Sequence, residues 1–327
     1  MVEVPNELID FIQSGKHFVV AGHEDPDGDC VGSQLALCSL LRRMGKNAVP
    51  CSAGPFKRPE LKQFVQFFLP FPENREGLKV LVMDCSIRER VGDLPVDGLP
   101  AAAVDHHAHS ASGGDGTHDS VPCWGDVIFL DPHAPSVTFI TEKIFRALGM
   151  EPTQEEAELL LFGLLTDTGF FRHLDQTSAE TFKTAARLTA AGASPKKLFG
   201  MINGGKQLNS RLLMGTILSK TRSYFNGKLL VSGETLEEST RYAMASRDSD
   251  SIYQLLQSVE GVEAIVLIRE ENNEECTMGL RSRDRIDVAA IAEQFGGGGH
   301  KNAAGCRTQG SLAGLEEKVI AAFKEWF

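Results

Sequence analysis

The strongest constraint on the fold of this chain is the alternation of short apolar runs with helical patterns in its first half. The predicted strands are residues 18–21, 48–51, 80–84, 102–105 and 127–130. Between the first two, residues 30–44 have apolar side chains at helical spacing and stop before Gly45. Such alternation predicts an α/β domain with a parallel sheet and helices on both faces.

Further helical patterns follow, and the character then changes. Thr153 and Glu156 form a capping box for a helix that runs to about residue 166, and helices are expected at 179–191, after Ser194, and at 207–221. The loop 109–125 looks mobile. From residue 223, an Asn-Gly turn at 226–227 predicts a hairpin, followed by strands at 264–269 and 276–282, a helix at 288–295 and an amphipathic C-terminal helix. We therefore expect a catalytic domain over 1–190, a helical linker over 191–222, and a smaller α/β domain over 223–327.

Composition restricts the classes of function. The formal net charge of −11 argues against a protein that coats long nucleic acid. No apolar stretch reaches the ~18 residues of a membrane helix, and the acidic N-terminus does not resemble a signal peptide, so we expect a cytoplasmic protein without membrane contact. The seven cysteines are scattered and lack the close spacing of a zinc site. We expect reduced thiols.

The segment 22–30, GHEDPDGDC, follows a predicted strand and opens a helix. Several acidic groups beside an imidazole at one strand end repel one another unless a cation binds there. The alternative is an acidic loop that caps the next helix, because carboxylates favour helix N-termini.

Other acids and histidines occupy comparable places. Asp84 ends an apolar strand, and another strand runs directly into Asp105, His106 and His107. Asp167 ends an apolar helix, where a carboxylate opposes the helix dipole. Departures from such local rules tend to mark functional sites, and ligands of parallel sheets bind at the carboxyl ends of the strands.

These motifs, HEDPDGD, Asp84, DHH at 105–107 and TDTG at 166–169, resemble the DHH phosphoesterase superfamily. The segment GGGGHKNAAG at 296–305 resembles the signature of its type 1 DHH-associated domain. Their order and spacing are similar to the compact two-domain group of nano-RNases (oligoribonucleases) and phosphoadenosine-phosphate phosphatases. The resemblance covers nearly the whole chain.

The resemblance implies two divalent ions, with manganese expected and magnesium or cobalt as alternatives. The implied ligands of the first ion are His23 and Asp27, those of the second are Asp29, His106 and Asp167, and Asp84 would bridge the two. Asp105 would orient a ligand histidine, and His107 would face the substrate phosphate and protonate the leaving group. A hydroxide shared by the ions would attack phosphorus.

The second domain is expected to bind the substrate. Backbone N–H groups of a glycine run can surround an anion, and the strand before it carries two arginines that would share one face. The expected substrate-binding residues are Arg269, Arg281, Ser282, Arg283, Gly297, Gly298, Gly299 and His300. One departure from the family pattern is Gly279, where members often carry serine.

The predicted function is hydrolysis of short oligoribonucleotides or dinucleotides, and of 3′-phosphoadenosine 5′-phosphate. Two alternatives stay open: a phosphodiesterase for cyclic or linear signalling dinucleotides, and a catalytically silent nucleotide sensor. A sensor would be revealed by a missing metal ligand, and none of the six positions is missing. Whether the chain forms a homodimer also stays open.

Overall fold

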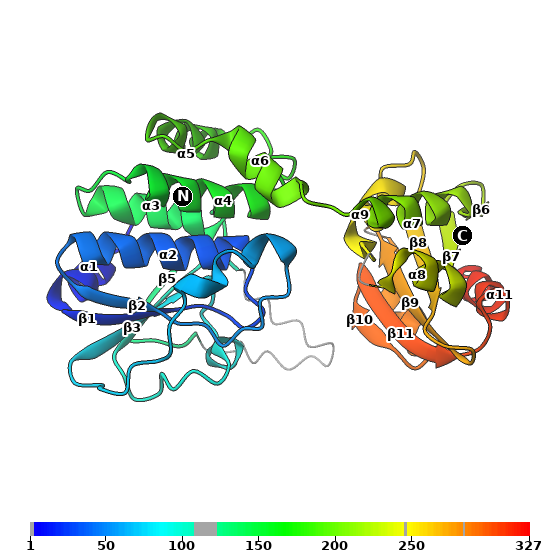
Figure 1. Ribbon diagram of the computed structural model, residues 1–327, viewed down its shortest axis with the longest axis horizontal. Coiled ribbons are helices and arrows are strands. Elements are labelled where there is room, and N and C mark those ends of the chain that lie inside the picture. Colours follow the sequence, from blue (N-terminus) through cyan, green and yellow to red (C-terminus); the bar gives the residue numbers. More distant parts are fainter. Residues whose placement is uncertain (1–2, 108–122, 245–246, 284) are drawn as a thin grey trace. The chain divides into compact units, whose positions relative to one another are not determined.

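The computed structural model describes residues 3–107, 123–244, 247–283 and 285–327. It divides into two compact units, Met1–Gly204 and Gly205–Phe327, whose elements are labelled in Figure 1. Part of the segment expected as a helical linker belongs to each unit. Leu198, in the helix before the division, is buried in the core of the first unit, whereas Leu213, in the helix after it, is buried in the second. Most of the predicted 109–125 loop lies outside the described residues.

The first unit is built on a parallel sheet with the strand order β2-β1-β3-β4-β5. Its strands are β1 (His17–Ala21), β2 (Asn47–Pro50), β3 (Leu78–Met83), β4 (Ala101–Asp105) and β5 (Val127–Leu130). Because β2 and β3 pair with opposite edges of β1, the strand order reverses between β1 and β3. A reversal of this kind leaves a crevice at the carboxyl ends of the two strands, where ligands bind.

The α-helices of this unit all lie on one side of the sheet (Figure 1). They are α1 (Asn6–Ser14), α2 (Gly28–Arg43), α3 (Val137–Ala147), α4 (Gln154–Asp167), α5 (Ala179–Ala190) and α6 (Pro195–Asn203). In Figure 1, α2 lies against the sheet, and α3 and α4 lie on the side of α2 away from the sheet, with α5 and α6 packed on α3 and α4. Most residues of α2 are buried, because the helix lies between two layers. The predicted capping box of α4 is present, with Thr153 and Glu156 in the expected roles.

The opposite face of the sheet has a different cover. Val19, Val80 and Val82 form a second core there with Val91, which belongs to the short 3-10 helix η3 (Arg88–Val91). Gly92, Pro95, Gly98 and Pro100 follow closely and do not favour a longer helix. The sequence predicted helices on both faces of this sheet. Among the described residues, α-helices cover one face, and the short η3 with its loops covers the other. The 3-10 helices η1 (Pro59–Leu61) and η2 (Val65–Phe67) precede β3.

The second unit is built on a mixed sheet with the order β10-β11-β9-β8-β7-β6, and among its described strands only β7 and β8 pair in parallel. Its strands are β6 (Arg222–Tyr224), β7 (Leu229–Glu234), β8 (Ala264–Glu270), β9 (Glu275–Ser282), β10 (Gly298–His300) and β11 (Ala303–Gln309). The predicted hairpin joins β6 to β7, and Asn226 and Gly227 both have positive φ there (56° and 91°). Asn-Gly is favoured in such turns for this reason.

Helices cover both faces of this second sheet. They are α7 (Leu208–Ser219), α8 (Leu236–Tyr242), α9 (Ser249–Gln257), α10 (Val288–Glu293) and α11 (Leu312–Phe323). Ile291 and Val319 bring α10 and α11 into one core, and Ile217 and Leu256 bring α7 and α9 into the other. The second unit therefore has a separate core on each face of its sheet, and the two units together agree with the predicted α/β fold class.

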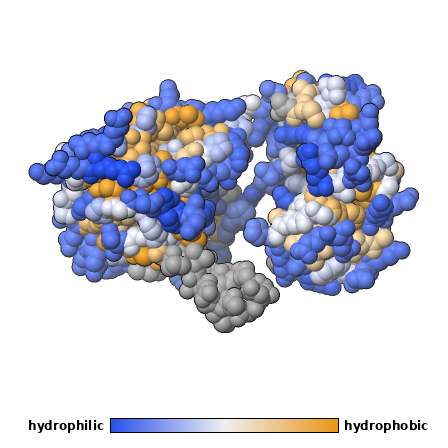
Figure 2. Space-filling view, turned by 90° about the horizontal axis from the view of Figure 1, so that it is seen from below, coloured by the Kyte–Doolittle hydropathy of each residue, from blue (hydrophilic) through white to orange (hydrophobic). Residues whose placement is uncertain are grey.

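Among the described residues, no helix is both long and apolar enough to span a bilayer. Hydrophilic side chains surround the apolar areas that Figure 2 shows on each unit.

Candidate metal centre and a second pocket

The first side chain of the candidate centre follows β1. His23 is 6% exposed, and its Nδ1 donates a hydrogen bond to the carbonyl oxygen of Glu24 at 2.7 Å. Its Nε2 therefore carries the lone pair and lies 3.4 Å from Oδ2 of Asp84. Burial lowers the pKa of His23, more than the hydrogen bond to Glu24 and the charge of Asp27 raise it. A neutral imidazole with a free Nε2 is a form that binds a metal.

Asp84 lies at the centre of the cluster, immediately after β3. Its φ is 62°, in the left-handed region that residues other than glycine rarely adopt. The side chain is 1% exposed, and its Oδ1 is buried without a hydrogen-bond partner among the described residues. Burial and then the charges of Asp29 and Asp27 raise the pKa of Asp84. A strained backbone and a buried oxygen without a partner both destabilise the fold, which indicates that a cation completes this site.

The DHH segment extends from the end of β4. Oδ1 of Asp105 accepts hydrogen bonds from the backbone of His106 (2.8 Å) and His107 (3.1 Å) and from Nδ1 of His107 (2.7 Å), and its Oδ2 accepts one from Ser86. Burial would raise the pKa of Asp105, but the hydrogen bonds from His107 and Ser86 lower it below its usual range. The carboxylate thus stays ionised and orients the ring of His107, the residue assigned to the substrate, whereas the Nδ1 of His106 bonds a different group.

His106 is oriented by a different group. Its Nδ1 donates to the carbonyl oxygen of Ala134 at 3.1 Å, which leaves Nε2 as the acceptor. That Nε2 lies 3.3 Å from Oδ2 of Asp167 and 3.6 Å from Oδ1 of Asp84. The residues around this imidazole therefore direct its lone pair to a point between two carboxylates, as a second ligand shell does for a metal-binding histidine.

The two carboxylates that open α2 have separate local roles. Oδ1 of Asp27 caps α2 by accepting from the backbone N–H groups of Asp29 and Cys30, so the capping alternative describes part of its function. Its Oδ2 lies 3.9 Å from Nη1 of Arg58. Asp29 is fully buried, and its two oxygens accept from the backbone of Val137 (2.5 Å) and Thr138 (2.8 Å), at the N-terminus of α3. Helix N-termini stabilise carboxylates in this way.

Asp167 is the last residue of α4. Burial and then the charges of Asp29 and Asp27 raise the pKa of its carboxyl to about 8, and burial also raises the pKa of Asp29. Without a cation, the cluster cannot ionise fully near neutral pH, because its carboxylates repel one another. A divalent cation would offset this repulsion.

The structure brings most of the expected metal ligands together. Three groups of described residues have ligand atoms within 4.8 Å of one another: His23, Cys30 and Asp84; Asp84, His106 and His107; and Asp29, His106 and Asp167. Asp27 lies beside these groups. Cys30 was not expected there, and burial raises the pKa of its thiol well above the usual value. A protonated thiol is a poor ligand.

Arg58 is a functional candidate that the sequence analysis missed. It lies in a loop beside Asp27, and its positive charge lowers the pKa of Asp167, although burial and the neighbouring carboxylates raise that pKa further. No motif includes this residue, so nothing in the sequence pointed to it. Arg172, the cation next to the TDTG motif, donates to Nε2 of His173 at 3.2 Å.

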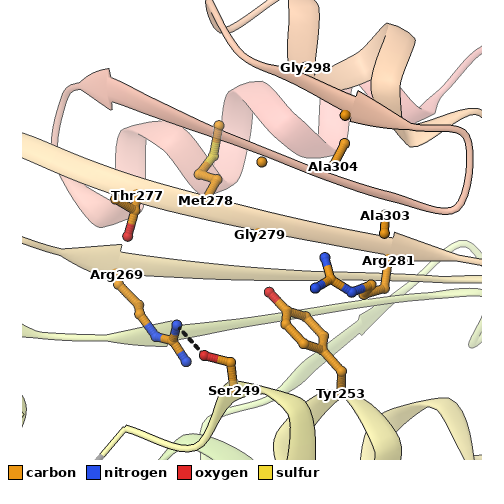
Figure 3. Close-up of a pocket in the computed structure, with 12 residues that line it drawn as sticks. Ser249, Tyr253, Arg269, Thr277, Met278, Gly279, Arg281, Gly298, Ala303 and Ala304 are labelled. Atoms are coloured by element: carbon orange, nitrogen blue, oxygen red, sulfur yellow. Dashed lines mark hydrogen bonds between the residues drawn. The ribbon is translucent and has the colours of Figure 1, made fainter. Parts of the chain in front are cut away.

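The second unit contains a pocket of about 420 Å³ between α9 and the strands β8, β9, β10 and β11. Figure 3 shows its residues. Nε of Arg269 donates to Glu234 (2.8 Å) and Nη1 to Ser249 (2.8 Å), while Nη2 is buried without a hydrogen-bond partner among the described residues. The guanidinium carbon of Arg281 lies 4.6 Å from the ring centre of Tyr253. The lining contains two cations and no carboxylate, so the pocket suits an anion.

Four of the eight expected substrate-binding residues line this pocket: Arg269, Arg281, Gly298 and Gly299. Ser282 instead faces the interior and donates to the carbonyl oxygen of Ile286 at 2.7 Å. Arg283 follows the end of β9 and donates to the carbonyl oxygen of Gln257, so it does not share a strand face with Arg281. His300 is exposed at the end of β10, outside the pocket lining.

The glycine run packs closely against a neighbouring strand. A Cβ on Gly297 would lie 2.2 Å from the carbonyl oxygen of Gly305, and one on Gly299 would lie 2.6 Å from that of Ala303. Gly298–His300 form β10, which pairs antiparallel with β11. Close strand packing thus requires two of these glycines, and Gly298 and Gly299 also line the pocket. The sequence analysis missed Ser249, Tyr253 and Thr277, which line the pocket too.

A cluster of carboxylates and imidazoles at the strand-order reversal, together with a second unit that can hold an anion, defines a class: two-domain α/β phosphoesterases. Comparison with known proteins gives the family. Residues 17–164 match the model of the DHH family, N-terminal domain, and residues 226–327 match that of the DHHA1 domain. The chain belongs to the DHH family, as its motifs predicted, and is one of its phosphoesterases.

Full-length relatives support this assignment. The chain is 32% identical over 307 residues to the bifunctional oligoribonuclease and PAP phosphatase NrnA of Thermus thermophilus, covering 94% of this chain and 89% of that protein. It is 26% identical to the protein of the same name from Bacillus subtilis, with 91% of each covered. A solved structure, an exopolyphosphatase-related protein from Bacteroides fragilis, shares the fold with a TM-score of 0.77 at 20% identity, over 98% of this chain and 94% of that one.

Proposed function

We propose that this protein hydrolyses phosphate esters of very short oligoribonucleotides and dinucleotides, and of 3′-phosphoadenosine 5′-phosphate, with two divalent cations. The observation that carries the proposal is the buried, unpartnered Oδ1 of Asp84, with Nε2 of His106 and Nδ1 of His107 each 3.6 Å away. The substrate class is supported by relatives that are named oligoribonuclease and PAP phosphatase and that match over most of their length.

The residues of the candidate centre fit two divalent ions. His23 and Asp27 would hold the first and Asp29, His106 and Asp167 the second, with Asp84 shared. A set of imidazole and carboxylate ligands without thiolate suits manganese, with magnesium and cobalt as alternatives. When bound, such ions lower the pKa of water and offset the charge that develops on a phosphoryl group.

The remaining residues of the site position the substrate and move protons. Asp105 fixes the ring of His107 through Nδ1, which leaves Nε2 on an imidazole that is 42% exposed. In this orientation His107 would contact the phosphoryl group and, when its ring also carries a proton on Nε2, would give that proton to the leaving oxygen and return to the neutral form. In the second unit, Arg269 and Arg281 would bind an anionic part of the nucleotide.

The decisive test is Asp84→Asn assayed with manganese. Asparagine keeps the size of the side chain and tolerates positive φ, so the fold should persist. We expect hydrolysis of a dinucleotide to fall at least about 100-fold, because removal of a shared ligand weakens both ions. The unmodified protein should lose activity with chelator and regain it with manganese.

The substrate panel for this assay contains linear dinucleotides, longer RNAs, cyclic dinucleotides, pyrophosphate and adenosine bisphosphate. Turnover of linear dinucleotides and adenosine bisphosphate should exceed that of the longer RNAs. Preference for the cyclic dinucleotides would favour the signalling phosphodiesterase instead. Normal turnover by Asp84→Asn would show that Asp84 is not a ligand shared by the two ions.

A further inference from the structure

Gly279 and Tyr253 form a complementary pair in the pocket of the second unit. On β9, buried and partly exposed residues alternate, so Thr277, Gly279 and Arg281 share the face that lines the pocket. A Cβ on Gly279 would lie 2.1 Å from the phenol oxygen of Tyr253. The absence of a side chain at position 279 is therefore what makes room for the hydroxyl of Tyr253.

The phenol oxygen is placed to meet a ligand. The Tyr253 residue is only 5% exposed, and it lines the pocket together with Arg269 and Arg281. Burial raises the pKa of this phenol, more than the nearby Arg269 and Arg281 lower it. The hydroxyl is thus protonated at neutral pH and can donate a hydrogen bond. Beside it, Nη2 of Arg269 is buried without a partner among the described residues, and a buried polar group in that state is costly unless water or a ligand binds it.

Two other donors flank this hydroxyl. Figure 3 shows the ring of Tyr253 rising from α9 between the side chains of Arg269 and Arg281, with its oxygen towards β9. Arg269 offers its unpartnered Nη2, because Glu234 and Ser249 occupy the other two nitrogens. Arg281 bonds only one protein group that the structure describes, the carbonyl oxygen of Leu280, and lies over the ring of Tyr253.

We propose that Tyr253 is a ligand-binding residue of this pocket, and that its hydroxyl binds one phosphate group of the nucleotide together with Arg269 and Arg281. The proposal deepens the proposed function and rests on it, in that the ligand is a nucleotide. Three donors that line the same pocket can bind the oxygens of one phosphate, and charge-assisted hydrogen bonds of this kind are the strong ones. Gly279 contributes by leaving space for the hydroxyl.

The test is binding of adenosine 5′-monophosphate to the full chain, measured by calorimetry with chelator present so that no divalent ion contributes. Tyr253→Phe removes only the hydroxyl and keeps the ring beside Arg281. We expect the Kd for the monophosphate to rise about tenfold, the effect of one hydrogen bond to a charged group. The Kd for adenosine should not change. Tyr242→Phe, the same substitution outside the pocket, should bind the monophosphate as the unmodified protein does.

A double-mutant cycle tests the pair directly. Gly279→Ala should displace the phenol and raise the Kd for the monophosphate by a similar factor. In the Tyr253→Phe background the same substitution should add little, because the nearest ring atom is then 3.3 Å from the new Cβ. Gly279→Ser combined with Tyr253→Phe returns a hydroxyl to the pocket from β9 and should recover part of the loss. Thermal melts of each variant check that the fold persists.

Three results would overturn the proposal: unchanged monophosphate binding by Tyr253→Phe, equal losses for monophosphate and adenosine, or additive losses in the cycle. Dinucleotide hydrolysis is measured separately on the unmodified protein with manganese. Absence of that hydrolysis with an intact binding cycle would contradict the proposed function and leave the role of Tyr253 supported.

Discussion

At the scale of single residues, the sequence indicated side chains that the structure brings together in the candidate metal centre, but it did not indicate the groups that orient them. Strand ends indicated His23 and Asp84, because the carboxyl ends of parallel strands meet at one edge of a sheet, and the motif order indicated Asp167 at the end of a helix. The partners that orient them are backbone groups, such as the carbonyl oxygen of Glu24 for His23. Because nearly every residue carries the same backbone groups, residue identity does not show which backbone group orients a side chain. The same reasoning missed Arg58, which reaches the site from a loop without a motif.

The bond between Asp105 and His107 gives a prediction at this scale. Asp105→Asn replaces the acceptor of the His107 Nδ1 hydrogen bond with a neutral group, so the ring loses its preferred tautomer and orientation. We expect kcat for a dinucleotide to fall on the order of 10- to 100-fold while manganese affinity changes little. Steady-state kinetics with a manganese titration checks both. An equal loss in Asp105→Asn and Asp84→Asn, with manganese affinity also lost, would instead make Asp105 part of the ion site.

At the scale of elements, the regular segments were predictable and the contacts between them were not. Apolar periodicity located α2 and α4 closely, but α3 (Val137–Ala147) was not predicted. Its N-terminus binds the buried Asp29, a contact between residues more than a hundred positions apart. Likewise, α9 was not predicted, and it supplies Ser249 and Tyr253 to the second pocket. Contacts over such distances depend on packing, which a local pattern does not record.

The close approach of α4 to α3 and α2 gives the second prediction. A Cβ on Gly163 would lie 2.4 Å from Cγ2 of Thr138 and 2.9 Å from Oδ1 of Asp29. Gly163→Ala should therefore displace Asp29, with a loss of stability of about 1–3 kcal/mol and weaker manganese binding.

Gly215→Ala is the matched control, since Gly215 lies in α7 with nothing within 4 Å of its added Cβ. That substitution should stabilise by about 0.5–1 kcal/mol, because alanine is the better helix former. Denaturant unfolding and manganese titration give both quantities. Tight manganese binding by Gly163→Ala would show that the position of Asp29 does not depend on this contact.

At the scale of the whole molecule, the sequence predicted two domains but placed a linker where the structure has a division. The helices α6 and α7 belong to different units because each carries its apolar residues into a different core. The acidic cluster affects the molecule as a whole, because its repulsion opposes folding of the unit that contains it. Metal binding, stability and pH are therefore linked.

The last prediction follows from the sign of this linkage. The folded state raises the pKa of Asp167 from 3.8 to about 8, so between these values the folded state binds more protons than the unfolded state. The contribution of Asp167 to the stability of the metal-free protein should therefore be fully present near pH 4 and should decrease as the pH rises towards 8. Manganese should reverse the decrease, with a larger increase in Tm at pH 8 than at pH 5, because ligands must be ionised to bind it.

Asp167→Asn removes the titrating group, so the metal-free variant should be more stable than the unmodified protein at pH 8 and should respond less to manganese. Asp93→Asn, at an exposed carboxyl of the same unit, is the control and should keep the original pH dependence. Thermal melts with chelator and with manganese, across pH 5 to 8, measure each case. If the metal-free protein instead gained stability as the pH rose, repulsion within the cluster would not be what the cations relieve, and the argument that the acidic centre is built to bind them would lose its electrostatic basis.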